Sequence, residues 1–187
     1  MNEARDWCSI VKSAVMSGVC VGIAGFGYMA TRDIVGSVLF AFALLTVVNY
    51  KLLLYTGTAG FIRKGEWAYL FVILLGNIVG CGLVALLARL ALGPLHGGLL
   101  SIACGFIMTT AVTFARKGNN LPLLFGVPLF IVCGFPHCIA DAFYYLAVPC
   151  AFWAEHFGSI LLFYASIVLG NFIGCNFYRL VMGGNPE

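Results

Sequence analysis

Residues 134–141 read GFPHCIAD and lie inside an apolar run that covers residues 121–153. A helix needs about 20 residues to cross a bilayer, so this run is too long for one simple transmembrane helix. Four residues within it disrupt helical hydrogen bonding: Pro128, Gly134, Pro136 and Pro149. A broken helix at membrane depth is tolerated only where its freed backbone groups face protein or a wet cavity. The stretch therefore predicts a broken transmembrane helix.

His137 lies in that break. An ionisable side chain at mid-bilayer depth costs a few kcal/mol on insertion scales, so it marks a pathway or a binding site by default. The alternative is a buried neutral histidine that hydrogen-bonds a neighbouring helix. We expect His137 to be a functional residue.

The composition is that of an integral membrane protein. Of the 187 residues, 62% are hydrophobic and 9% are charged, and the mean hydropathy is +1.03. These values exclude an ordinary soluble domain. The formal net charge of +3 is too small to indicate a nucleic-acid partner. The eight cysteines lie mostly in apolar runs and lack the spacing of a metal site, so neither a metal nor another cofactor is expected.

Apolar runs bounded by charged or turn residues predict six transmembrane helices. Their expected limits are residues 13–30, 34–61, 67–92, 98–115, 121–152 and 158–181. Residues 1–12 precede them as a short interfacial segment. Seven basic residues then fall on the side of the N-terminus and two on the other side. The positive-inside rule therefore predicts a multi-pass protein of the cell's inner (plasma) membrane, with both termini in the cytoplasm.

An internal repeat relates the third predicted helix to the sixth. The segment GNIVGC at residues 76–81 recurs 94 residues later as GNFIGC at residues 170–175. Helices that are three spans apart cross the membrane in opposite directions, so the repeat is an inverted one. The expected fold is thus all-α, with six transmembrane helices in two inverted three-helix repeats.

The two halves of this fold are residues 13–92 and residues 98–181. Small residues spaced four apart in each repeated segment suit plain helix packing. Packing does not explain Asn77 and Asn171, whose amides need polar partners inside the membrane. Both asparagines are therefore predicted pathway residues.

The second predicted helix contains a matching break candidate, YTGTAG at residues 55–60. Interrupted helices at corresponding positions of two halves are the best indication of a transport site in a sequence. We therefore expect Thr56 and His137 to line one pathway within a single channel domain over residues 1–187. The alternative for Thr56 is a hydroxyl that bonds back to its own helix. Asp141, one turn after His137, either holds the imidazole or caps the second half-helix.

Large apolar side chains near the two breaks are candidates for constrictions. Phe40 and Leu44 share a helical face on the approach to Thr56, and Phe130 lies about two turns before His137. Apolar rings above and below a polar site form dry barriers to ions. Because 14% of the chain is aromatic, a place in the core is an equally good interpretation of such residues.

The set of motifs resembles that of the formate/nitrite transporter family. GFPHCIAD at residues 134–141 is similar to that family's GFEHxxAN, and LYTG at residues 54–57 is similar to its LFT loop. Both GNxxG motifs match as well, and the order and spacing are similar over nearly the whole chain. Leu53 and Pro136 stand where members commonly have acidic residues.

This resemblance implies an aquaporin-like protomer, a homopentamer with one pore per protomer, and transport of formate, nitrite, hydrosulfide or a similar small monovalent weak-acid anion. It implies that His137 is the central pore histidine and that Thr56 belongs to a flexible loop, with Tyr55 as its supporting neighbour. The other implied site residues are Asn171 in the sixth helix and the constriction residues Phe40, Leu44, Leu54 and Phe130.

An anion that enters a low-dielectric passage loses much of its solvation, and this loss must be compensated. A histidine can supply a proton, because its ordinary pKa of about 6.5 lets small shifts change its charge in the physiological range. We therefore predict a channel or transporter for weak-acid anions with a proton relay at His137. Its partners would be the anion, protons and the lipid bilayer.

Three other functions are weaker interpretations of the same residues. A neutral-solute pore of the water or glycerol type needs paired NPA-like half-helices, which the sequence lacks. A membrane-embedded enzyme needs a second convergent catalytic group, so no enzymatic activity is expected. A non-transporting membrane protein leaves the paired breaks unexplained.

Overall fold

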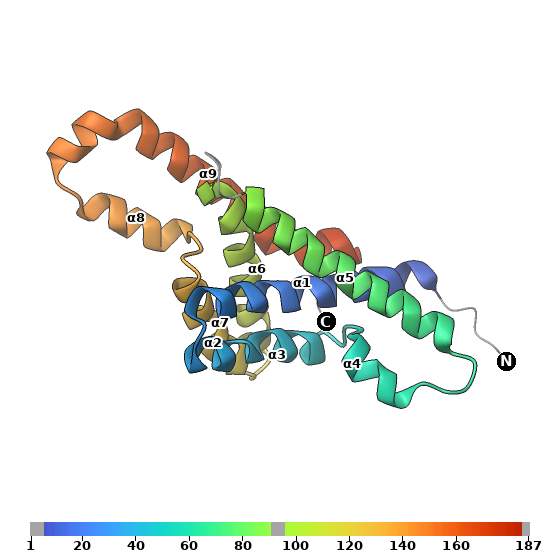
Figure 1. Ribbon diagram of the computed structural model, residues 1–187. Helices are drawn as coiled ribbons and strands as arrows, with labels where there is room; N and C mark the ends of the chain where they lie inside the picture. The colour runs from blue at the N-terminus through green and yellow to red at the C-terminus, as the bar shows by residue number, and fades with distance from the viewer. Residues whose placement is uncertain (1–5, 91–95, 185–187) are drawn as a thin grey trace. The chain divides into compact units, whose positions relative to one another are not determined.

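The computed structural model describes residues 6–90 and 96–184, and these residues form helices and no strands (Figure 1). Four of the described helices are long and apolar enough to cross a membrane: α1 (Trp7–Thr31), α5 (Trp67–Leu90), α6 (His96–Arg116) and α9 (Cys150–Met182). Shorter apolar helices follow α1 and α6 in the chain. The chain is therefore an all-α membrane protein, as its composition predicts.

The chain divides into two compact units, residues 1–86 with residues 178–187 and residues 87–177. In the first unit, α1 contacts the two short helices that follow it, α2 (Ile34–Leu39) and α3 (Ala41–Asn49). In the second unit, α6 contacts α7 (Leu121–Val132) in the corresponding place.

α1 begins earlier than the predicted residue 13 because Asp6 caps it. The Asp6 Oδ1 atom accepts the N–H of Cys8 at 3.1 Å and the N–H of Ser9 at 3.3 Å. Residues 7–12, which were predicted to precede the first span, are therefore continuous with this helix. Residues 1–5 lie outside the described part of the chain, as does residue 92, the predicted end of the first half.

α2 and α3 together make one nearly continuous helix. Only Phe40 separates them, and its backbone is itself helical, with φ of −57° and ψ of −24°. Asp33 caps α2 by accepting the Gly36 N–H at 3.1 Å, and this hydrogen bond lowers the pKa of the Asp33 carboxyl.

The chain leaves the helix after α3 and resumes it at α4 (Tyr55–Thr58), which continues into the short 3₁₀ helix η1 (Ala59–Phe61). The second predicted helix is thus interrupted, but the predicted position of the break, residues 55–60, is wrong. Those residues are helical and the break precedes them, because Asn77 fixes Tyr55 as the first residue of α4, as shown below.

The fifth predicted helix is broken at the expected motif. α7 ends at Val132, and α8 (Cys138–Ala147) begins directly after His137. Pro128, predicted to disturb this helix, lies inside α7 without ending it.

α9 is much longer than predicted. It has 33 residues and begins at Cys150, whereas the predicted helix began at residue 158. Pro149 accounts for the end of α8 and for the start of α9. It holds the preceding residue, Val148, in an extended conformation with ψ of 154°, which ends α8. Proline is well tolerated at the start of a helix, so α9 follows at once.

Glycines let the long helices approach closely within each unit. A side chain on Gly80 of α5 would overlap the backbone of α1 at Val15. A side chain on Gly174 of α9 would overlap the backbone of α6 at Ile102. Small residues permit this kind of contact between membrane helices. The contact brings the asparagine of each repeated segment against the facing helix.

Candidate functional site

α3 ends in a Schellman turn, in which a left-handed residue redirects the chain and two backbone hydrogen bonds close over the last helical turn. Lys51 is the left-handed residue, with φ of 53°. Its N–H donates to the Val48 carbonyl at 3.2 Å, and the N–H of Leu52 donates to the Val47 carbonyl at 2.9 Å. Leu52 is buried, as the apolar residue of such a turn usually is.

α7 also ends in a Schellman turn. Gly134 is its left-handed residue, with φ of 64°. Its N–H donates to the Ile131 carbonyl at 3.1 Å, and the N–H of Phe135 donates to the Phe130 carbonyl at 3.0 Å. Phe135 is buried in the place that Leu52 takes in the first unit. Lys51 and Gly134 therefore occupy equivalent positions.

Asn77 of α5 holds the first break. Its Oδ1 accepts the N–H of Tyr55, the first residue of α4, at 2.8 Å. Its Nδ2 donates to the Leu53 carbonyl at 3.0 Å and to the Ala14 carbonyl of α1 at 2.8 Å. The residue is 8% exposed, and its oxygen and both amide hydrogens are in use.

Asn171 of α9 holds the second break with the same three bonds. Its Oδ1 accepts the N–H of Cys138, the first residue of α8, at 2.8 Å. Its Nδ2 donates to the Pro136 carbonyl at 3.0 Å and to the Ser101 carbonyl of α6 at 2.8 Å. Asn171 is 6% exposed. Both asparagines were predicted to line a pathway, but their amides are used up in holding the two breaks.

These bonds fix the correspondence between the two breaks. Tyr55 is equivalent to Cys138, so the residue before each is equivalent too, and Leu54 is the counterpart of His137. Thr56, which was predicted to approach the pathway from the first half, lies two residues after this counterpart.

His137 ends the break as the N-cap residue of α8. Its Nδ1 accepts the N–H groups of Ile139 and Ala140, each at 3.3 Å. An imidazole nitrogen that accepts hydrogen bonds carries no proton, so the proton of the neutral ring lies on Nε2. The Phe130 ring stacks on the imidazole, with 5.5 Å between the ring centres and 25° between the ring planes. The predicted pair of Phe130 and His137 is therefore brought together.

Asp141 caps the same helix from within. Its Oδ2 accepts the backbone N–H of His137 at 2.7 Å. Of the two roles considered for Asp141, this geometry supports the cap. Together His137 and Asp141 satisfy three backbone N–H groups at the start of α8.

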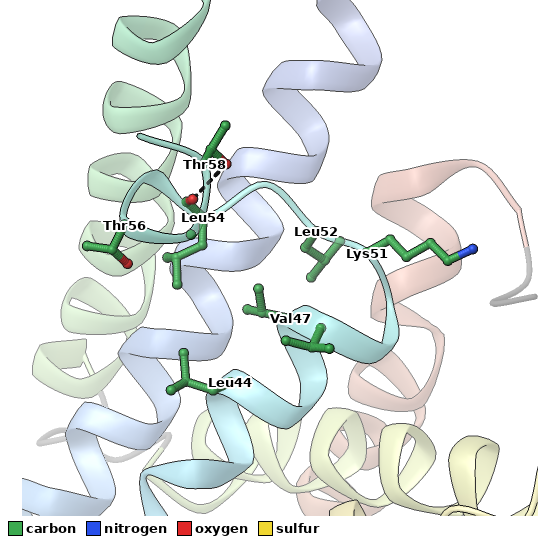
Figure 2. A pocket seen from close by; sticks show the side chains of 9 residues that line it. Leu44, Val47, Lys51, Leu52, Leu54, Thr56 and Thr58 are labelled. Carbon is green, nitrogen blue, oxygen red and sulfur yellow. Dashed lines mark hydrogen bonds between the residues drawn. The ribbon is translucent and has the colours of Figure 1, made fainter. Parts of the chain in front are cut away.

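Three of the predicted residues of the first unit, Leu44, Leu54 and Thr56, line a cavity of about 390 Å³ (Figure 2). Leu44 and Leu54 contribute apolar side chains to it, and Thr56 and Thr58 lie beside them. The Thr58 hydroxyl donates to the Leu54 carbonyl of its own helical turn at 2.8 Å. Thr56 is exposed. Phe40, half-buried at the junction of α2 and α3, is not one of the lining residues.

Lys51, which was not among the predicted site residues, also lines this cavity. Figure 2 shows its side chain extending from the loop after α3, away from Leu44 and Thr56. A signal for it existed. Lys51 is a single basic residue inside the second predicted span, and a charge at such a place indicates function by default.

The described residues contain no cluster of three His, Cys, Asp or Glu side chains that could hold a metal ion. The polar side chains at the two breaks include hydroxyls and the Lys51 ammonium in the first unit, and the His137 imidazole, the Asp141 carboxylate and the Cys138 thiol in the second. Comparison of the chain with protein-family models, with curated proteins and with solved structures found no match.

Proposed function

We propose that the protein is a channel or transporter for small monovalent weak-acid anions such as formate, nitrite or hydrosulfide, as its resemblance to the formate/nitrite transporter family implies. The observation that carries this proposal is the pair of equivalent helix breaks, each closed by a Schellman turn and held by a buried asparagine. Matching interrupted helices in two halves of a membrane protein mark a substrate site. A protein with a purely structural role has no need of two such breaks.

The proposed fold has six membrane crossings in two inverted repeats with an aquaporin-like arrangement. Four crossings would be α1, α5, α6 and α9, and the other two would be the interrupted segments α2 to η1 and α7 to α8. The excess of basic residues on one side favours both termini in the cytoplasm of a cell whose plasma membrane holds the protein.

His137 has two ways to act on an anion. As a neutral ring it can donate a hydrogen bond from Nε2–H, because Nδ1 is occupied as the cap of α8. A relay requires the doubly protonated ring, and protonating Nδ1 breaks its contacts with Ile139 and Ala140. We propose that an approaching anion offsets this loss, so that Nδ1 takes a proton from water as the substrate arrives and the proton on Nε2 passes to the anion.

The test is initial uptake of formate, nitrite, hydrosulfide, acetate and lactate into proteoliposomes that contain the purified protein. His137→Asn is the sharpest variant, because asparagine is a good N-cap residue and keeps α8 intact while removing the titratable ring. We expect it to fold normally and to reduce anion uptake by at least about tenfold. His137→Phe removes the cap as well and should lower both uptake and thermal stability.

External pH separates the two ways in which His137 can act. Wild-type uptake should rise as the external pH falls from about 8 to 5, because protons supplied to the relay and protonated substrate both become commoner. The His137→Asn variant should keep only the part of this pH dependence that comes from protonation of the substrate. An unchanged rate and pH profile in that variant would make His137 structural. Swelling in glycerol without anion uptake would indicate a neutral-solute pore instead.

A further inference from the structure

The backbone of Leu53, inside the first break, is held from two helices. Its N–H donates to the Oγ of Ser13 in α1 at 3.0 Å. Its carbonyl accepts a hydrogen bond from Nδ2 of Asn77 in α5, also at 3.0 Å. Ser13 is 8% exposed, so its hydroxyl belongs to the interior of the first unit. The break is therefore tied to α1 by a serine as well as to α5 by the asparagine.

In the second break, the residues at these two positions cannot form the serine bond. Pro136 is the counterpart of Leu53, because the carbonyl of each accepts from the asparagine of its unit. Leu100 is the counterpart of Ser13, because the carbonyl of the following residue accepts from the same asparagine in each unit. Proline has no N–H, and a leucine side chain has no acceptor. The hydroxyl is thus present in the unit that has an N–H to satisfy and missing in the unit that has none.

Leu54, the next residue, depends on these anchors for its position. Its counterpart His137 holds itself in place, because its ring accepts two N–H groups of α8. Leu54 has no polar side chain and makes no side-chain cap on α4, a helix of four residues. Its backbone lies between two anchored groups, the N–H of Leu53 and the N–H of Tyr55. The serine and the asparagine therefore determine where the Leu54 side chain lies.

The Leu54 side chain lines the cavity of the first unit, together with Leu44 and Leu52 (Figure 2). Leu53 is not one of the lining residues, so it contributes its backbone and not its side chain. Apolar side chains form a dry barrier, and the width that they leave open limits the size of the solute that passes. A shift of the break would move Leu54 and change that width.

We infer that Ser13 is a positioning residue, which holds the backbone of Leu53 so that Leu54 restricts passage to the smallest anions. The inference rests on the proposed transport function and adds to it a residue that determines selectivity by size. Ser13 acts only through Leu53 and Leu54, because its hydroxyl is occupied by the Leu53 N–H.

The test compares wild type with Ser13→Ala in proteoliposomes, with formate as the small probe anion and lactate as the large one. Removing the hydroxyl leaves the Leu53 N–H without an acceptor, which favours a shifted break in which this group finds another partner. The ratio of the initial uptake rate of lactate to that of formate should therefore rise at least about fivefold. Ser13→Thr keeps the hydroxyl and should keep the wild-type ratio.

Two further variants separate the hydrogen bond from the mere loss of a hydroxyl. Ser17→Ala is the same substitution one turn along α1, at a buried hydroxyl that has no hydrogen-bond partner among the described residues. It should leave the ratio unchanged. Leu53→Pro, added to Ser13→Ala, removes the N–H that lost its acceptor. It should restore the wild-type ratio, because the equivalent turn of the second unit has a proline at this place.

The outcomes separate this inference from the proposed function. If wild type takes up no anion, the transport function fails and the inference fails with it. If wild type transports but Ser13→Ala keeps the wild-type ratio, only the inference is overturned. An equal fall in the uptake of both anions, together with a lower unfolding temperature, would also overturn it, because Ser13 would then be purely structural.

Two other results would count against the hydrogen bond itself. These are a raised ratio in Ser17→Ala, and a raised ratio in Ser13→Ala that Leu53→Pro does not restore. Should Ser13→Ala fail to fold, Ser13→Cys takes its place, because sulfur is a weaker acceptor in a side chain of similar shape. It should raise the ratio by less than alanine would, and an unchanged ratio would overturn the inference.

Discussion

Asn171 shows how a single side chain can organise a helix break inside a membrane protein. A break frees backbone groups that neither water nor lipid satisfies at that depth. The carboxamide has one acceptor and two donor hydrogens, and here they meet the freed Cys138 N–H, the freed Pro136 carbonyl and a carbonyl of α6. The group that needs partners and the groups that have lost them therefore satisfy each other.

We expect Asn171→Leu to destabilise the protein by at least about 2 kcal/mol, because it leaves buried backbone groups of α8 and of the break without partners. The matched control is Asn176→Leu, five residues along the same helix, where Nδ2 donates to the Phe172 carbonyl of its own helix. Asn176→Leu should lower the free energy of unfolding by much less than Asn171→Leu does. Thermal unfolding in detergent, followed by circular dichroism, measures both variants.

A different pattern would give Asn171 the pathway role that its motif first indicated. In that case Asn171→Leu would keep its unfolding temperature and lose anion uptake. Asn171→Asp, which keeps the oxygen acceptor and loses the two donor hydrogens, should lie between wild type and Leu in stability if the hydrogen bonds to the break are what matters.

The sequence was sufficient to single out both asparagines, because a polar amide in an apolar repeat needs an explanation. It could not identify their partners, since Tyr55 and Cys138 contribute backbone N–H groups that any residue has. The same limit explains why the break of the first unit was predicted at residues 55–60 instead of before Tyr55. A segment rich in glycine and threonine predicts a turn. The actual turn lies at Lys51, which adopts the left-handed conformation although it is not a glycine, so the sequence does not indicate it.

At the scale of elements, several helix limits follow from local caps or from proline. Asp6, Asp33 and His137 each accept backbone N–H groups at a helix start, and Pro149 separates α8 from α9. The four long helices agree with predicted spans in place, because apolar composition indicates them directly. Their ends were less predictable. A cap such as Asp6 lies inside a mixed segment whose composition also suits an interfacial helix.

We expect Gly174→Ala to disrupt the packing of α9 on α6. Its added methyl would overlap the Ile102 carbonyl and the backbone at Phe106, and backbone cannot move aside as a flexible side chain can. The expected cost is about 1 to 3 kcal/mol, the range found for overpacking in tight interiors. Gly158→Ala is the control in the same helix, since nothing lies within 4 Å of the new methyl there.

Alanine is a better helix former than glycine, so Gly158→Ala should be neutral or slightly stabilising. Thermal unfolding of the two variants, side by side in one detergent, checks the prediction. If Gly174→Ala were as stable as Gly158→Ala, then close helix contact would not be what the GNxxG segments provide, and the repeat would need another explanation.

At the scale of the whole molecule, the two units use one plan of contacts on different side chains. The Schellman turns, the asparagine bonds and the glycine contacts recur, while Leu54 takes the place of His137 and Lys51 that of Gly134. Equivalent positions at the two breaks therefore carry unlike residues. The second unit has an imidazole where the first has a leucine, and the first unit has an ammonium group where the second has a glycine. Sequence similarity between the halves is confined to the GNxxGC segments, so the rest of the correspondence required coordinates.

The surface of the long helices gives the last prediction. In the most apolar windows of α5 and α9, only 28% of the residues are buried, against 56% in those of α1 and α6. Lipid can cover such faces, but the exposed large apolar residues of α5 and α9 also suit contact with other copies of the chain: examples are Phe71, Leu75, Ile78, Leu169 and Phe172. Together with the resemblance to a pentameric family, this exposure leads us to predict a homopentamer with one pathway per protomer.

Native mass spectrometry of the detergent-solubilised protein, with particle symmetry from electron microscopy as a second measurement, checks this assembly. Closed rings of identical chains bury the same pair of surfaces at each contact, so one substitution acts at all interfaces at once. Phe172→Ser, on an exposed face of α9, should therefore lower the pentamer fraction if that face is the contact. Gly158→Ala should leave it unchanged. A stable monomer or trimer in wild type would contradict the pentamer and weaken the transporter proposal with it. A pentamer that survives Phe172→Ser would instead assign the exposed face of α9 to lipid and the contact to α5.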